Sequence, residues 1–397
     1  MFQHVATAPP DSILGLNEAF RNDPNPAKIN LSVGIFKDAQ GGTPVLKCVK
    51  EAEKRLLDQE KSKNYLPIDG RPGYAKAVRE LMLGADHEVL QANRAVTVQT
   101  PGGTGALRVA GDFLAANFPG RAIWISQPTW PNHPSIFEAA GLELKSYPYF
   151  DKSTNGLNFD GMLEALQTAA TNDIVLLHGC CHNPTGIDPT PEQWTQIADL
   201  VQHRELLPLL DFAYQGFGDG LAEDAAGLKE LARPGQELLV CSSFSKNFGL
   251  YNERVGALTA IAASDAEAAA VLSQLKKAIR SNYSNPPTHG AAVVETVLTD
   301  AQLTQQWEGE LAEMRNRING MRNLFVDKMA AVGVDHDFSF IQHQKGMFSF
   351  SGLNQMQVDQ LRNEFSIYIV GSGRINVAGI SEDNVDRLCE GIKKVLG

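Results

Sequence analysis

Ser242–Gly256 reads Ser-Ser-Phe-Ser-Lys-Asn-Phe-Gly-Leu-Tyr-Asn-Glu-Arg-Val-Gly, and its lysine decides how the rest of the chain is interpreted. The apolar residues 238–241 before it predict a buried strand, after which the chain turns polar at once. Lys246 therefore stands where desolvation lowers a lysine pKa and leaves a nucleophilic amine that can form an imine with an aldehyde. A phosphate would suit three neighbouring side chains: Ser243, Ser245 and Arg254. A solvated surface loop is the alternative interpretation.

Composition indicates an ordinary globular protein. The chain has 397 residues, enough for two domains and a large core. Its net charge of −11 argues against a nucleic-acid partner, which needs a basic surface. No run of about 18 apolar residues is present, so we expect no membrane span. The five cysteines form no CxxC pair, no metal-ligand spacing occurs and the N-terminus has no leader pattern. We therefore expect a cytoplasmic protein with reduced thiols and no bound metal.

The N-terminal part of the chain predicts an arm, which is followed by a second candidate phosphate site. Residues 1–30 are rich in Pro, Asn and Asp and predict an arm rather than a domain. Further on, the glycine-rich turn Thr100–Gly105 precedes an expected helix at 106–116. Because such a turn presents backbone N–H groups to an anion, Gly103 and Thr104 are candidates for binding phosphate. A tight turn that uses glycine for its positive φ is the alternative.

Strand and helix patterns alternate through the middle of the chain, which predicts a largely parallel sheet between helices. The expected strands are 122–126, 142–149, 173–178, 206–212, 237–242 and 255–261. The expected helices are 47–59, 74–83, 135–140, 159–168, 191–203, 228–232, 266–281 and 302–332. In such sheets ligands bind beyond the carboxyl ends of the strands, and Lys246 falls there.

After about residue 330 the pattern changes and predicts a small α+β region. It consists of segments 338–341 and 346–350, a helix at 356–365, a strand at 374–377 and a helix at 382–395. We expect the long helix at 302–332 to join this region to the sheet.

Other strand ends carry the groups that pyridoxal 5'-phosphate (PLP) requires. PLP has an aldehyde and a phosphate, and it needs a carboxylate near its pyridinium nitrogen so that the ring accepts electrons. Asp211 closes the apolar run 206–210, where a buried carboxylate is costly unless it is paired. Tyr214 and Asn183 are suited to the phenolate oxygen of the same ring. A capping aspartate and an Asn-Pro turn remain the alternatives for Asp211 and Asn183.

Taken together, four motifs resemble class I aminotransferases of fold type I, within the aspartate and aromatic branch. They are His182-Asn-Pro-Thr-Gly186, Asp211-x-x-Tyr214, Ser243-x-Ser-Lys246 with Arg254, and Gly373-Arg-x-Asn-Val-Ala-Gly379. The resemblance runs from about residue 9 to the C-terminus. It implies a PLP-dependent α/β fold with a mostly parallel seven-stranded sheet in a large domain, plus a smaller α+β domain. The implied divisions are an arm and part of the small domain at 1–45, the large PLP-binding domain at 46–310 and the rest of the small domain at 311–397.

The resemblance also implies a role for each motif residue in binding the cofactor. Lys246 would carry PLP as an imine and move the proton between the substrate Cα and the cofactor. Asp211 would pair with the ring nitrogen with support from His133, and Trp130 would stack on the ring. The phenolate oxygen would be held by Asn183 and Tyr214. The phosphate would be held by Gly103, Thr104, Ser243, Ser245, Arg254 and, from the neighbouring subunit of a homodimer, Tyr65.

For the substrate, the resemblance implies two arginines. Arg374 would clamp the α-carboxylate, and Arg280 would reach across the dimer to the side-chain carboxylate of aspartate or glutamate. Without the motifs, a surface ion pair would be the better interpretation of either arginine. The remaining implied substrate contacts are Asn183, Trp130 and Gly34.

The implied reaction is transfer of the amino group from aspartate to 2-oxoglutarate by a ping-pong mechanism. An aromatic or dual-specificity aminotransferase is the alternative within the branch. A fold type I lyase or decarboxylase would keep Lys246 and Asp211 but would not need Arg280. Ser243-Phe-Ser-Lys246 also fits a serine acyltransferase signature, but its companion motifs are absent.

Overall fold

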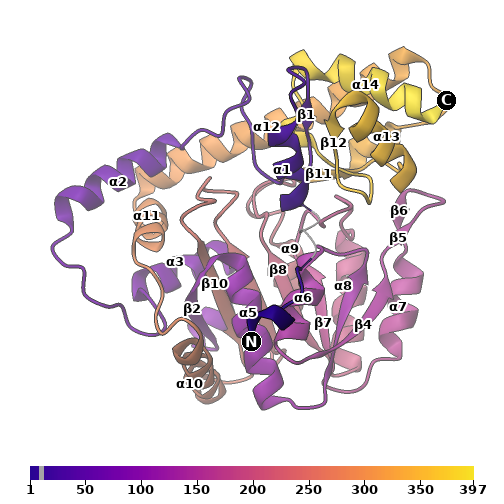
Figure 1. The fold of residues 1–397 in the computed structure, drawn as a ribbon. Coiled ribbons are helices and arrows are strands. Elements are labelled where there is room, and N and C mark those ends of the chain that lie inside the picture. Colours follow the sequence, from indigo (N-terminus) through magenta and orange to yellow (C-terminus); the bar gives the residue numbers. More distant parts are fainter. Residues whose placement is uncertain (9–12) are drawn as a thin grey trace.

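A seven-stranded sheet forms the centre of the larger part of the molecule in the computed structural model, which describes residues 1–8 and 13–397 (Figure 1). Six strands point the same way, and the seventh, β10, lies antiparallel between β2 and β9. The order is β2 (Ala95–Pro101), β10 (Val255–Ile261), β9 (Leu238–Ser243), β8 (Leu207–Phe212), β7 (Ile174–His178), β3 (Ala122–Gln127) and β4 (Glu143–Pro148). The expected mostly parallel sheet is confirmed.

Helices cover both faces of this sheet, and two apolar cores result. Successive strand residues point to opposite faces, so Leu209 and Leu210 belong to different cores. One core contains side chains of α5 (Gly102–Asn117), α6 (Asn132–Ala139) and α10 (Asp265–Asn282). The other contains side chains of α2 (Lys47–Gln59), α3 (Pro72–Leu83), α7 (Phe159–Gln167), α8 (Pro191–His203) and α9 (Ala226–Leu231). A sheet buried on both faces explains why its central strands are apolar runs.

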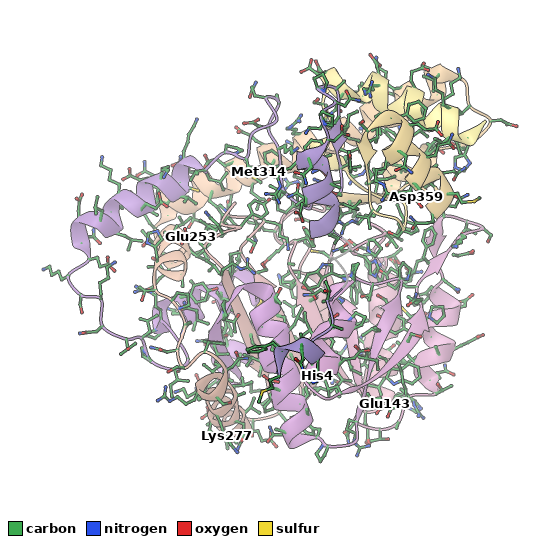
Figure 2. All side chains as sticks on the ribbon, viewed as in Figure 1. His4, Glu143, Glu253, Lys277, Met314 and Asp359 are labelled. Atoms are coloured by element: carbon green, nitrogen blue, oxygen red, sulfur yellow. The ribbon has the colours of Figure 1, made fainter. Side chains whose placement is uncertain are left out.

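The C-terminal part lies above the carboxyl ends of the sheet strands in Figure 1. The long helix α12 (Ala301–Val332) leads into it from α11 (His289–Leu298), and Met314 on α12, labelled in Figure 2, is buried. Beyond α12 come β11 (Phe348–Phe350), α13 (Gln355–Phe365), β12 (Ile367–Tyr368), β13 (Arg374–Asn376) and α14 (Glu382–Leu396). Strand β1 (Ile29–Asn30) pairs in parallel with β12, which joins the two ends of the chain. The boundaries proposed at 45 and 310 stay predictions, and the second falls inside α12.

Several elements differ from the sequence-based expectations, including the short strands β1, β5 (Phe150–Asp151), β6 (Gly156–Leu157) and β12 and the short helix α4 (Glu88–Gln91). The segment expected to be an arm contains α1 (Leu14–Asn22), because contacts far away in sequence support it, including the edge of Phe20 on the Tyr368 ring at 5.5 Å. Strand β2 and helix α11 were not expected either. Residue 9, where the family resemblance begins, lies outside the described residues. Among the described residues, no helix has the length and apolar character needed to cross a membrane; the cytoplasmic location stays a prediction.

Candidate active site

Lys246 and Asp211 meet at the carboxyl edge of the sheet because the two strands that lead to them are parallel neighbours. Asp211 of β8 pairs with Cys241 of β9, and Lys246 follows the end of β9. Both side chains border a cavity of about 520 Å³. The same cavity is lined by Gly34, Gly103, Thr104, Trp130, Asn183, Tyr214, Ser243, Ser245, Arg254 and Arg374. The structure therefore brings together twelve of the fourteen residues predicted to contact the cofactor or the substrate.

The amine of Lys246 lies 4.7 Å from the centroid of the Tyr214 ring. Burial lowers the pKa of Lys246, and the negative charge of Asp211 opposes that effect only in part. Arg254 and Arg374 lower the pKa of Lys246 further. The net shift favours the neutral amine, which is the nucleophilic form.

Asp211 is held as a carboxylate at the base of the cavity. Burial alone would raise its pKa, but the hydrogen bond from His133 and the nearby positive charge bring the pKa below its ordinary value. His133 Nε2 lies 3.1 Å from Asp211 Oδ2, and His133 Nδ1 lies 2.8 Å from the hydroxyl of Thr129. The predicted support of Asp211 by His133 thus has the geometry that it requires. An ionised carboxylate in this place can pair with a buried cation.

A cradle for an anion lies beside Lys246. Gly103 and Thr104 are in the first turn of α5, where free N–H groups and the helix dipole favour negative charge. Arg254 Nη1 donates to Ser245 Oγ at 3.3 Å and to the Tyr251 carbonyl at 3.0 Å. Glycine is required in the wall of this cradle, since a Cβ at residue 256 would collide with the backbone of residue 102. The donors have the chemistry that a phosphate needs.

Arg374 closes the opposite side of the cavity. It donates from Nη1 to Asn183 Oδ1 at 3.1 Å and from Nη2 to the Ser32 carbonyl at 2.6 Å. Its Cζ lies 4.1 Å from the centroid of the Phe348 ring, and burial lowers its pKa to about 10. Arg374 Nε is buried and has no hydrogen-bond partner within the described residues. A buried guanidinium without a counter-charge is costly, so this position favours a bound carboxylate.

Tyr65 and Arg280 lie outside the cavity of their own chain. The Tyr65 side chain is 93 % exposed. Arg280 is exposed in the last turn of α10, where it donates to the hydroxyl of Ser284. The resemblance assigned both residues to the active site of a second subunit, and their exposure fits that prediction without testing it.

Several cavity residues were not predicted. Tyr251 and Phe348 line the cavity, and the Tyr251 hydroxyl accepts the Phe36 N–H at 2.9 Å. Tyr251 stands within the stretch that decided the interpretation, so its proximity to Arg254 was a usable signal.

His178 was missed as well: both of its ring nitrogens are buried without partners in the described part of the chain. Burial and the neighbouring His133 lower the pKa of His178 to about 3, so it stays neutral.

The chain belongs to the family of class I and II aminotransferases, whose model matches residues 26–392. It is 58 % identical over 396 residues to the aspartate aminotransferase of Haemophilus influenzae, with all of both chains covered. It is 49 % identical to the aromatic-amino-acid aminotransferase of Pseudomonas aeruginosa, covering 99 % of this chain and 98 % of the other. The predicted family and the predicted enzyme class are confirmed.

Solved structures agree with this assignment. The aromatic-amino-acid aminotransferase of Burkholderia pseudomallei, covalently bound to pyridoxal phosphate, superimposes with a TM-score of 0.97 at 50 % identity and full coverage of both chains. The cytoplasmic aspartate aminotransferase of Saccharomyces cerevisiae also gives 0.97, at 37 % identity, covering 100 % of this chain and 98 % of that one. The α/β fold of PLP-dependent aminotransferases is therefore the fold of this chain.

Proposed function

We propose that this enzyme uses PLP to transfer the amino group of L-aspartate to 2-oxoglutarate, giving oxaloacetate and L-glutamate. One observation carries the cofactor and the reaction type: a buried lysine amine and a buried carboxylate share a cavity with an arginine whose Nε has no hydrogen-bond partner among residues 1–8 and 13–397. The preference for aspartate is supported by the relatives. Three aspartate aminotransferases are 54–58 % identical to this chain. Three aromatic or tyrosine aminotransferases are 46–49 % identical, a range that also contains two further aspartate aminotransferases, at 46 % and 48 %.

The residues of the cavity fit PLP. Asp211 would pair with the ring nitrogen, Lys246 would hold the aldehyde carbon, and Trp130 would cover the ring. Asn183 and Tyr214 would hold the phenolate oxygen. The phosphate would lie in the cradle formed by Gly103, Thr104, Ser243, Ser245 and Arg254. When bound, PLP supplies an aldehyde and a ring that withdraws electrons from the substrate Cα.

The chain itself supplies binding and proton transfer. Arg374 would bind the substrate α-carboxylate through the guanidinium edge that includes Nε, while Asn183 and Ser32 fix its other two nitrogens. Lys246 Nζ then takes the proton from the substrate Cα, for which a depressed amine pKa is required. Asp211, fixed by His133, remains ionised throughout and needs no reorganisation during the reaction.

Recognition of the second carboxylate of aspartate is proposed to need a homodimer. Arg280 would enter the cavity of the partner subunit, and Tyr65 would add a hydrogen bond to the partner's phosphate. The N-terminal residues Met1, Phe2 and Val5 are exposed apolar side chains, which supports a covering partner. Sedimentation velocity of the PLP-loaded protein should show a dimer at micromolar concentration; a monomer that is fully active would contradict the shared site.

A substrate panel tests the proposed reaction. The PLP-loaded protein is assayed with aspartate, glutamate, tyrosine and phenylalanine as donors and 2-oxoglutarate as acceptor, and kcat/KM is compared. We expect aspartate to exceed phenylalanine. The second candidate, an aromatic or dual-specificity aminotransferase, is favoured by the aromatic relatives at 46–49 % identity and predicts equal or reversed values.

The same panel separates an aminotransferase from a lyase or decarboxylase. Keto-acid formation from the donor should require an added 2-oxo acid. Product that forms at an equal rate without an acceptor, or release of carbon dioxide, would instead support the lyase or decarboxylase.

A further inference from the structure

Residues 181–188 form a loop that carries Asn183, and we call it the Asn183 loop. The carboxylate of Asp188 closes this loop. Asp188 Oδ2 accepts the backbone N–H of Cys181 at 2.7 Å, and Asp188 Oδ1 accepts that of His182 at 2.9 Å. These are the two residues immediately before Asn183. Both oxygens of a side chain outside the active-site cavity therefore fix the backbone that leads into Asn183.

Further hydrogen bonds restrain the Asn183 loop in addition to those of Asp188. The N–H of Gly186 donates to the His182 carbonyl at 2.7 Å, and the Thr185 hydroxyl lies 2.8 Å from His182 Nδ1. The Gly186 carbonyl accepts the backbone N–H of Lys345 at 2.6 Å. His182 Nε2 lies 3.0 Å from the hydroxyl of Ser126 on β3. The Asn183 loop is thus attached both to the sheet and to the segment that leads into β11 and Phe348, which borders the cavity.

Asn183 in turn fixes Arg374, since its Oδ1 accepts the guanidinium N–H at 3.1 Å. We propose that Asp188 is a positioning residue, which sets Asn183 for the cofactor and, through Asn183, sets Arg374 for the substrate carboxylate. The proposal rests on the proposed function for what Asn183 and Arg374 bind, but not for the coupling between Asp188 and Asn183.

Asp188 borders a second cavity, of about 320 Å³, behind the active site. Burial raises its pKa to about 6, although the two N–H donors and Lys345 act in the opposite direction. Charged neighbours that line this cavity are Asp219, Glu223, Asp224 and Lys345. Burial of a carboxylate beside other carboxylates costs folding free energy. We therefore expect it only where both of its oxygens are needed as hydrogen-bond acceptors.

The cavity offers a matched control. Asp224 is also buried, and its carboxylate accepts the backbone N–H groups of Gly216, Gly218 and Asp219 at 2.8–2.9 Å. However, no residue from 216 to 220 lines the active-site cavity. Loss of either carboxylate removes hydrogen bonds from a loop, but only Asp188 lies on the route to Asn183.

A double-mutant cycle tests the proposal. Asp188→Asn keeps the shape but leaves one buried N–H without an acceptor, and it is combined with Asn183→Ala. The dissociation constant of PLP from the apoprotein, kcat and KM for aspartate and the melting temperature are measured for all four proteins. We expect Asp188→Asn to lower kcat/KM about ten-fold and to weaken PLP binding in the presence of Asn183. In the Asn183→Ala background the same change should cost less than about two-fold.

Asp224→Asn should lower the melting temperature while kcat/KM stays within about two-fold of the wild type. Equal losses from Asp188→Asn in both backgrounds, or the same kinetic loss from Asp224→Asn, would overturn the proposal. Asp188→Ser replaces Asp188→Asn if the latter is not recovered folded. If the protein proves to have no transaminase activity, the proposed function fails, but the four PLP dissociation constants still decide whether Asp188 acts through Asn183.

Discussion

The active-site cavity and the exposed surface around Tyr65 and Arg280 differ in how complete they are within one chain. The cavity contains the amine, the carboxylate and the anion cradle, each buried and held by partners from the same chain. Tyr65 and Arg280 extend toward solvent instead. If Tyr65 and Arg280 reach a partner's cavity as proposed, one chain supplies most of the cofactor contacts, whereas one phosphate contact and the recognition of the substrate side chain need the assembly.

Loss of the Lys246 amine should have the largest effect, because no other lysine is among the described residues that line the cavity. We expect Lys246→Ala to lose nearly all turnover, on the order of 10³-fold or more, together with covalent attachment of PLP. Turnover and the protein mass after borohydride reduction measure the two effects. Lys152→Ala, an exposed lysine outside the cavity, serves as the control. Near-normal turnover by Lys246→Ala would contradict the assignment of this amine.

Arg280→Ala should separate the substrates. If Arg280 binds the side-chain carboxylate of aspartate across the dimer, its removal costs about 2–5 kcal/mol for dicarboxylic substrates and much less for phenylalanine. The ratio of kcat/KM for the two donors measures this difference. Lys277→Ala, one turn earlier on α10 and labelled in Figure 2, is the matched loss of charge. Equal losses on both donors would show that Arg280 does not contact the side chain.

Tyr65→Phe should have a moderate effect confined to the cofactor. A hydroxyl that donates to a phosphate contributes roughly 1.5–3 kcal/mol, so PLP should bind at least about ten-fold more weakly to the dimer. The melting temperature of the apoprotein should change little, since phenylalanine keeps the ring and only the contact with the phosphate is lost. Titration of apoprotein with PLP measures the affinity. An unchanged dissociation constant would remove Tyr65 from the shared site.

The smallest expected effect is on the stability of the apoprotein. Burial lowers the pKa of Lys246 from 10.5, so the unfolded chain binds more protons than the folded one between the lowered pKa and 10.5. Stability should therefore rise with pH across that interval. Lys246→Met removes the buried amine and should raise the apoprotein melting temperature by about 1 °C, roughly 1 kcal/mol for a chain of this length. Thermal melts at several pH values should show this advantage shrinking toward pH 10.5; an advantage that is independent of pH would contradict a charged buried amine.

The sequence predicted those parts of the fold that local patterns encode. The bounds of α8 agree with the expectation, because Pro191 at its first position and the Thr190–Gln193 capping box mark its start. Helix α1 was missed because it depends on distant contacts such as Phe20 on Tyr368. Edge strand β2 was missed because the sequence does not reveal that it pairs antiparallel with β10.

The active-site residues likewise divide into those that local sequence patterns predict and those that they do not. Lys246 and Asp211 could be placed because each follows or ends an apolar run, and parallel strands bring such ends together. Phe348 could not, since its approach to Arg374 depends on the antiparallel pairing of two strands of only three residues each, β11 and β13. His178 carries no motif of its own and is recognised only in the structure, where both ring nitrogens are buried and lack hydrogen-bond partners in the described part of the chain.

The bond from Arg374 to the Ser32 carbonyl joins residues that are 342 positions apart in sequence. On the ribosome, every strand of the large sheet is synthesised before residue 374, since the last of them ends at Ile261. The nascent polypeptide is therefore expected to contain its cofactor-binding residues first. Arg374, which is proposed to bind the amino-acid carboxylate, is added only near the end of translation.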